Sequence, residues 1–289
     1  MSTPQLPMPQ QAAPAPSWHT APGASYTSPI PVVRTHLGHA IASEWTKIRT
    51  VRSTIWTIGV FLFLVFGLGL LFTFVVAASD EELGGDSALP LGFAGVLPGS
   101  ICVITLGVLT TASEYGTGLI RTTMTACPGR GRVLVAKSIV FFTLAFVVTL
   151  VATSLVALFQ VSILEGHGGR QPTGGEWLKA TVGISLYVAL LGLLSLLVGS
   201  VIRHSAGAIT LMIGLVLAPL VIALFLFSSS LEGVRQAMFE YSIPNQLSIF
   251  YDNSLSRSGP DGWDPLWIVL GVTAVAFAGA YALLEKRDV

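Results

Sequence analysis

The residues that could do chemistry are few, and they gather in two segments of the chain. The first segment, His36–Arg52, carries the charged and aromatic side chains Glu44, Trp45, Lys47 and Arg49. The second, Ser113–Lys137, reads SEYGTGLIRTTMTACPGRGRVLVAK. Acids and bases mixed in this way form ion pairs or meet a charged partner. The chain has no HExxH or GxSxG motif and no paired carboxylates in its apolar blocks, so we expect no catalytic residue and no cofactor.

One stretch of the second segment imitates a nucleotide-binding loop. Gly131–Ser138 reads GRVLVAKS, a P-loop pattern in which Ala136 replaces the second glycine. A P-loop needs a glycine-rich turn between a strand and a helix, so that backbone N–H groups can surround a phosphate. Here the residues continue directly into an apolar block. We therefore expect that this chain does not bind ATP and is not an enzyme.

Metal and disulfide chemistry have equally little support. His36 and His39 lie three residues apart, but no third ligand is near, which favours two solvated imidazoles over a metal site. Cys102 lies in an apolar block and Cys127 between blocks, so we expect no disulfide between them.

The composition excludes most classes of protein. Of 289 residues, 52% are hydrophobic and only 10% are charged, whereas soluble domains have about 25% charged residues. The balance of 15 Lys+Arg against 15 Asp+Glu argues against a cationic nucleic-acid binder. Unbroken apolar blocks without period-two alternation predict an all-α membrane protein rather than a barrel. Six blocks without an ionisable residue are predicted to span the membrane: 54–78, 91–112, 138–164, 180–202, 206–227 and 266–284.

The basic residues predict the orientation. With the N-terminus in the cytoplasm, eleven Lys and Arg fall in cytoplasmic segments and four outside, as the positive-inside rule requires. Both termini are then cytoplasmic.

Two further segments precede the six-span domain of residues 54–289. Residues 1–33 hold no charge and eight prolines, which predicts a disordered cytoplasmic tail; a recruitment peptide is the alternative. Residues 34–53 are predicted to form an amphipathic helix in the membrane interface. Its apolar face would consist of Leu37, Ile41, Trp45 and Ile48.

The loop between the second and third spans is longer than a helix connection needs. We expect a short helix over Thr117–Ala126, stopped by Pro128–Gly129, and a pairing of Glu114 with Arg121 or Arg132. The residue types alone favour two readings equally: a surface for a protein partner, or arginines that fix topology at lipid headgroups.

The motifs in these segments resemble a known family. From Ile41 to Val289 the chain resembles the permease subunits of bacterial type-2 ATP-binding-cassette (ABC) exporters. The resemblance is carried by SEW-K-R-T-RST before the first span, by SEYGTGLIRTT, and by P-GRGR-VLVAK entering the third span. The family usually has a basic residue directly after the Glu-Tyr pair, whereas this chain has Gly116 there. The resemblance implies a plasma-membrane permease, a second permease subunit, lipid contacts and a separate ATPase subunit. It also implies an ATPase-coupling segment, for which the candidates are Glu114, Tyr115, Gly116, Thr117, Gly118, Arg121, Arg130 and Arg132.

Several expectations remain open at this point. In Ser228–Pro265 two short helices are expected to dip into the outer leaflet, and the resemblance implies that they form an outer gate. An ion-driven carrier is disfavoured because the predicted spans lack ionisable residues, but it and a non-transporting scaffold or sensor subunit are the alternatives. Glycines within the spans, such as Gly69, Gly192 and Gly271, are expected to allow close helix packing. An amphipathic, drug-like or peptide-like substrate is expected.

Overall fold

The computed structural model describes residues 36–79, 83–126, 129–253 and 258–286, and within these ranges the chain is helical without a strand. Six helices among the described residues are long and apolar enough to cross a membrane. They are Arg52–Ala78, Leu89–Thr117, Arg130–Ile163, Gly174–Ile202, Ser205–Phe225 and Asp264–Lys286. The predicted all-α fold with six spans is confirmed.

The helices extend beyond the predicted spans where charged residues begin. Helix α3 (Phe93–Thr117), preceded by the short η1 (Leu89–Gly92), continues past Glu114, and α5 (Arg130–Ile163) begins seven residues before Lys137. The predicted blocks themselves hold no Asp, Glu, Lys, Arg or His, but the complete helices carry charged residues in the turns beyond them. The helices can continue because Glu114 and Lys137 find partners of opposite charge, as described below.

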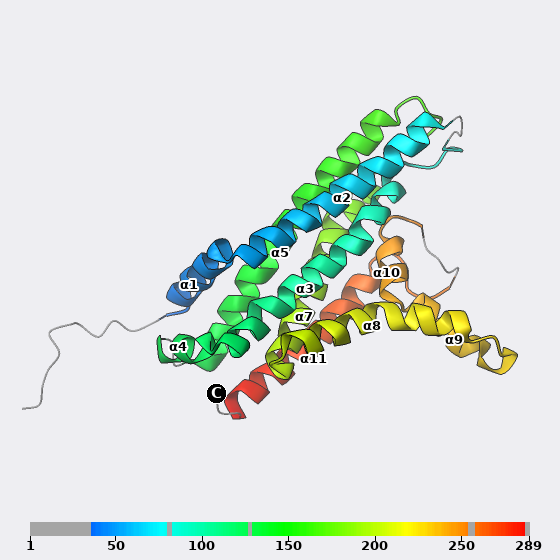
Figure 1. Ribbon diagram of the computed structural model, residues 1–289. Helices are drawn as coiled ribbons and strands as arrows, with labels where there is room; N and C mark the ends of the chain where they lie inside the picture. The colour runs from blue at the N-terminus through cyan, green and yellow to red at the C-terminus, as the bar shows by residue number, and fades with distance from the viewer. Residues whose placement is uncertain (1–35, 80–82, 127–128, 254–257, 287–289) are drawn as a thin grey trace, which may run out of the picture. The chain divides into compact units, whose positions relative to one another are not determined.

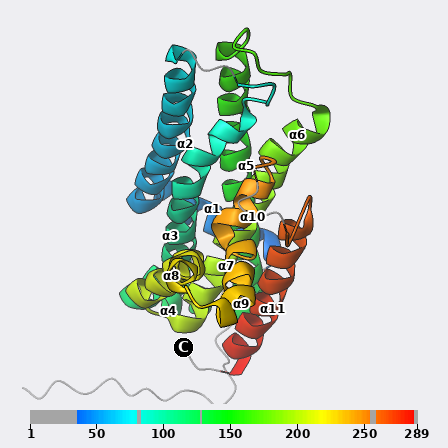
Figure 2. The same ribbon diagram turned by 90° about the vertical axis from the view of Figure 1, so that its right-hand side faces the viewer.

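The centre of the bundle is α7 (Ile184–Ile202), which follows α6 (Gly174–Leu178) and one turn of π-helix, η2 (Lys179–Gly183). It packs against α3, α5 and α11 (Asp264–Lys286), as Figure 2 shows. Tyr187 is fully buried in this core, and its hydroxyl donates to Gln246 Oε1 at 3.1 Å. By contrast α2 (Arg52–Ala78), α8 (Ser205–Phe225) and α11 leave large apolar side chains exposed, which suits helices that face lipid.

Glycine allows α3 and α7 to approach closely. A Cβ built on Gly107 would lie 2.3 Å from the carbonyl oxygen of Gly192, and the Ser195 hydroxyl donates to the Ile104 carbonyl across the same contact at 2.8 Å. The packing role is confirmed for Gly69 and Gly192. It is wrong within this chain for Gly271, because a Cβ there would meet nothing within 4 Å.

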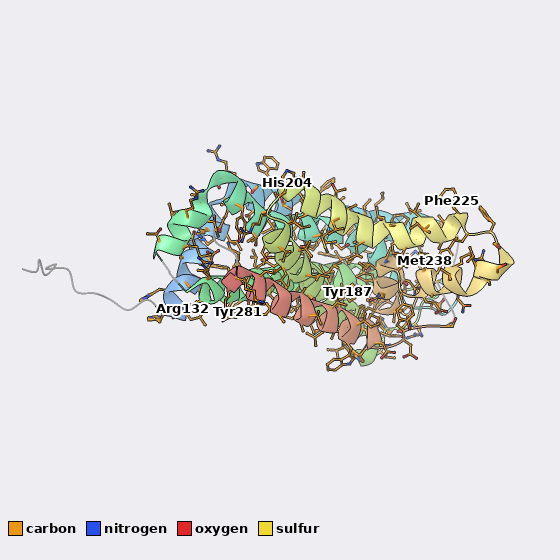
Figure 3. All side chains as sticks on the ribbon, turned by 90° about the horizontal axis from the view of Figure 1, so that it is seen from below. Arg132, Tyr187, His204, Phe225, Met238 and Tyr281 are labelled. Carbon is orange, nitrogen blue, oxygen red and sulfur yellow. The ribbon has the colours of Figure 1, made fainter. Side chains whose placement is uncertain are left out.

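Helices α1 (Leu37–Thr50) and α4 (Leu119–Ala126) lie at the same end of the bundle as the last turn of α11 (Figure 1). Arg130 at the start of α5 donates to the Leu284 carbonyl of α11 at 3.2 Å. Figure 3 labels Arg132 and Tyr281 at this end, where the Tyr281 ring packs over Gly131. This agrees with the prediction that the segments before the first span, after the second and after the sixth lie on one side.

The other end is built from the remaining connections. The Leu83 N–H donates to the His167 carbonyl at 3.0 Å, so the loops after α2 and α5 lie together. The two expected short helices are present as α9 (Glu232–Glu240), preceded by η3 (Ser229–Leu231), and α10 (Ile243–Ile249). Only α9 is largely exposed. Helix α10 is buried within the protein, because Phe250 at its end packs against Tyr187 and Trp263.

Candidate functional site: a buried charge cluster beneath helix α4

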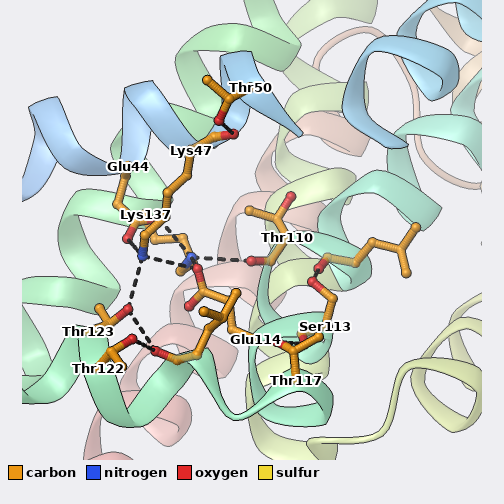
Figure 4. Close-up of polar contacts among 12 residues, drawn as sticks. Glu44, Lys47, Thr50, Thr110, Ser113, Glu114, Thr117, Thr122, Thr123 and Lys137 are labelled. Carbon is orange, nitrogen blue, oxygen red and sulfur yellow. Dashed lines mark hydrogen bonds and ion pairs between the residues drawn. The ribbon is translucent and has the colours of Figure 1, made fainter. Parts of the chain in front are cut away.

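Four ionisable side chains from three helices meet where α1, α3, α4 and α5 converge (Figure 4). Glu44 and Lys47 lie one turn apart on α1, Glu114 lies in the last turn of α3, and Lys137 lies in the second turn of α5. We call these four residues the buried charge cluster. Their formal charges cancel, which lowers the cost of removing them from water.

The distances in the cluster join helices that are far apart in the sequence. Lys137 Nζ lies 2.7 Å from Glu44 Oε2 and 2.9 Å from Glu114 Oε1. Lys47 Nζ lies 2.7 Å from Glu44 Oε1 and 3.1 Å from Glu114 Oε1. Each carboxylate therefore forms ion pairs with both ammonium groups, and these ion pairs connect α1, α3 and α5 at this end of the bundle.

Both ammonium groups use their full hydrogen-bonding capacity, because each has three N–H donors. The third acceptor of Lys47 is Thr123 Oγ1 on α4 at 3.1 Å, and that of Lys137 is the Thr110 carbonyl at 3.2 Å. The carboxylates are less saturated. Glu114 Oε2 is buried and has no hydrogen-bond partner among the described residues.

The Lys137 and Glu44 side chains are almost completely buried, with 3% and 4% exposed, and burial strengthens the attraction between them. The Lys47 side chain is more accessible, with 34% exposed. Burial alone would raise the pKa of Glu44, but the charge of Lys137 and the hydrogen bonds from both lysines outweigh it and hold that pKa below its ordinary value. Burial likewise opposes the charge of Lys47, yet its contacts with Glu44 and Glu114 raise the pKa of this lysine.

The cluster corrects one expectation from the sequence. Glu114 pairs with Lys47 and Lys137 and not with Arg121 or Arg132. It also shows that α1 packs on the bundle through a stripe of Ala40, Glu44 and Ile48, while Leu37 and Trp45 of the predicted lipid-facing side are exposed. Hydrophobic periodicity missed this stripe because its central member is a glutamate, buried only because lysines from two helices neutralise it.

The expected short helix is present and begins two residues later than predicted, at Leu119. Gly118 separates it from α3 by adopting the left-handed conformation, with φ 74°, which favours glycine. The hydrogen bond of Lys47 to Thr123 ties α4 to α1. Arg121 is exposed on α4, and Leu119 is 55% exposed, so this helix presents charge and apolar surface outward.

The other candidate residues lie around the cluster without joining it. The guanidinium carbon of Arg203 lies over the Tyr115 ring, 4.9 Å from the centroid of that ring. This cation–π contact connects the end of α3 to the turn between α7 and α8. Gly116 and Thr117 are exposed, as is Arg49 on α1. Arg130 contacts α11, and Arg132 follows it in the first turn of α5.

The P-loop-like residues Gly131–Ser138 lie within the regular helix α5. Val133, Leu134 and Ala136 are buried, so the backbone there forms helical hydrogen bonds and offers no phosphate cradle. Lys137, which stands where a P-loop lysine would stand, belongs to the buried charge cluster instead.

Comparison with known families decides the class of the protein. The sequence model of the ABC-2 family transporter proteins matches residues 40–227, which include most of α1, the whole cluster and the helices through α8. This chain belongs to the ABC-2 transporter family. It is a multi-pass membrane protein and a permease of an ABC transporter. No curated protein matches the chain.

The family match places the cluster inside the shared part of the ABC-2 transporter and leaves α9, α10 and α11 outside. The resemblance expected from Ile41 to Val289 is thus confirmed only as far as Phe227.

Proposed function

We propose that this ABC-2 transporter is the permease subunit of an exporter whose energy comes from a separate ATPase subunit bound at α4. The observation that carries this proposal is the fastening of α4 to α1 through Lys47, which also contacts α3 through Glu114. Because packed helices transmit a displacement rather than absorb it, a force applied to α4 would reach α1, α3 and α5 together.

The exposed residues of α4 suit a protein partner. Arginine and apolar side chains are enriched in protein interfaces, and α4 presents Arg121 beside Leu119. Closure of two ATPase subunits on ATP would then shift two permease subunits between inward-open and outward-open arrangements. The second permease would be another copy of this chain or a homologue, and the apolar spans suit an amphipathic, drug-like or peptide-like substrate.

The alternatives receive less support. An ion-driven carrier needs an ionisable group that binds and releases its ion during transport, whereas the four charges of the cluster neutralise one another and both lysines are saturated. A scaffold or sensor subunit would bind partners without moving a substrate.

The test is co-purification of the tagged, full-length chain in mild detergent, with its partner identified by mass spectrometry. Arg121→Glu should reduce recovery of the ATPase, because it replaces an attraction by a repulsion at the proposed interface. Loss of a paired interfacial charge costs about 2–5 kcal/mol, which corresponds to about thirtyfold or more in affinity.

Arg235→Glu is the matched control. Arg235 lies on α9 at the other end of the bundle, where it pairs with Glu232 at 2.6 Å on the surface, so this change should leave ATPase recovery unaltered. Equal recovery with wild type and Arg121→Glu, at equal membrane yield, would refute α4 as the ATPase contact.

A further inference from the structure

A cavity of about 260 Å³ lies where α1, α3, α4 and α5 meet the start of α2, next to the buried charge cluster. Its lining includes Val51, Ser53 and Thr54, at which α2 begins. Val51 and Ser53 are exposed, so the cavity opens to the surface there. Apolar lining residues come from α1, α3 and α4 and include Ile48, Leu106, Leu109 and Leu119.

Most polar groups of the lining are already bonded within the protein. The ammonium groups of Lys47 and Lys137 have three partners each. Glu114 Oε2 is enclosed and out of reach of a ligand. The lining hydroxyls of α3 and α4 donate to carbonyls of their own helices; they belong to Thr110, Ser113, Thr122 and Thr123. The cluster and these two helices therefore offer no free donor to the cavity.

The two lining hydroxyls of α2 are different, because neither Ser53 nor Thr54 has a side-chain hydrogen bond among the described residues. Thr54 is only 6% exposed, and it lines the cavity. Its hydroxyl oxygen is not enclosed in the way that Glu114 Oε2 is. A buried hydroxyl without a partner is unfavourable, so a ligand that accepts a hydrogen bond from Thr54 would be stabilised here.

The backbone at the same place also lacks acceptors. Helix α2 has no side-chain cap, and in the described chain the Thr54 N–H is the one bonded N–H of residues 52–54, donating to the Val51 carbonyl at 3.2 Å. Free N–H groups and the positive end of the helix dipole attract an anion. The negative end of α1 lies at the same junction, but Lys47 and Arg49 in its last turn offset it.

The surrounding charges favour an anion as well. The formal charges of the buried charge cluster cancel, whereas Arg49 and Arg52 at the junction are exposed and form no ion pair with any described residue. A cationic head would be repelled by these two arginines and would find donors instead of acceptors on α2. An anionic head meets attraction from both.

We propose that this cavity binds an amphiphile with a phosphate head, which accepts hydrogen bonds from Ser53 and Thr54 while its apolar chain contacts Leu106 and Leu109. A phosphate has enough oxygens for two hydroxyls and the free backbone N–H groups together. Trp45 and Trp56, which are 43% and 75% exposed, place the junction at the depth of lipid head groups. The cavity lies within this chain, so the proposal does not depend on the ATPase.

The experiment is native mass spectrometry of the purified full-length chain in a neutral detergent. It is titrated with oleoyl lysophosphatidic acid, with monoolein, which lacks only the phosphate, and with glycerol phosphate, which lacks only the chain. Lysophosphatidic acid should bind about tenfold or more tightly than monoolein, as expected for hydrogen bonds to a charged group. Comparable binding of glycerol phosphate would indicate a site for soluble phosphate esters, whereas its failure to bind would indicate a lipid site.

Two substitutions on α2 form a matched pair. Thr54→Val removes the hydroxyl at nearly constant volume and should abolish most of the preference for lysophosphatidic acid, while Thr54→Ser should keep it. Thr57→Val is the control, because Thr57 lies one turn later on α2 and does not line this cavity. Ser53→Ala, at an exposed position, should also reduce the preference and decides the matter if Thr54→Val folds poorly.

Three results would overturn the proposal. The first is equal binding of lysophosphatidic acid and monoolein to the wild-type protein. The second is an unchanged preference in both Thr54→Val and Ser53→Ala. The third is an equal loss of preference in Thr57→Val, which would locate the effect outside the cavity.

Discussion

The ammonium of Lys137 lies 2.7 Å from a carboxylate oxygen of Glu44, a residue 93 positions earlier in the chain, and both side chains are almost completely buried. This contact connects the helix before the first span to the start of the third. A buried pair is costly to break because the remaining partner keeps its charge without compensation. The first prediction follows from that asymmetry.

Lys137→Met should destabilise the protein strongly, because it leaves two carboxylates against one ammonium. Removal of one partner of a buried ion pair costs about 3–5 kcal/mol. The double variant Glu44→Gln/Lys137→Met restores neutrality and should be more stable than Lys137→Met alone, as measured by thermal unfolding in detergent. Lys179→Met is the control, because Lys179 pairs with the half-exposed Asp252 and should cost less than about 1 kcal/mol. A double variant less stable than Lys137→Met would refute charge balance as the cause.

The stability of the protein should depend on pH through the two cluster residues of α1. The pKa of Glu44 lies below its ordinary value of 4.5, so the stabilisation from this carboxylate is present above that pH and is lost as the pH falls through the lowered pKa. The pKa of Lys47 lies above its ordinary value of 10.5, so its stabilisation is full below that pH and is lost as the pH rises through the raised pKa. The midpoint of thermal unfolding should be constant between the pKa of Glu44 and the pKa of Lys47, and it should fall at more acidic and at more basic pH. In Glu44→Gln the acidic fall should be smaller, and an acidic limb identical to that of wild type would assign the effect to other carboxyls.

Gly107→Ala should weaken the packing of α3 against α7, since the added methyl group would overlap the Gly192 carbonyl. Overpacking of this kind typically costs about 1–3 kcal/mol. Gly214→Ala, in the middle of α8 with open space around it, should be neutral or slightly stabilising. The two variants can be compared by thermal unfolding and membrane yield. Equal stability of both would mean that α3 and α7 separate freely to accept the methyl group.

The topology gives a further prediction. Reporter fusions after the last residue and within 84–87 should report opposite sides of the membrane, with the C-terminal fusion in the cytoplasm, because most basic residues then lie inside. Reporters on the same side would refute the six-span arrangement. Reporters on opposite sides with the C-terminus outside would refute the orientation alone.

The sequence by itself determined the class of fold. Runs of about twenty apolar residues can satisfy their backbone hydrogen bonds in a bilayer only as helices, so composition and length were sufficient for six spans. The short helix α4 was also predictable, because Pro128–Gly129 ends a local helical segment, although the predicted start at Thr117 placed Gly118 inside the helix. These inferences depend on local patterns, which need no knowledge of neighbouring helices.

Only the tertiary structure decided which charges are buried and how they are paired. The local sequence does not indicate that Glu44 is buried while its neighbour Trp45 is 43% exposed. The partners of Glu114 lie 67 positions before it and 23 after it, and its sequence neighbours Arg121 and Arg132 were the wrong candidates. A charged side chain can be buried only where opposite charges from other helices meet it, and that meeting is created by the packing of the helices, not by the sequence of any one of them.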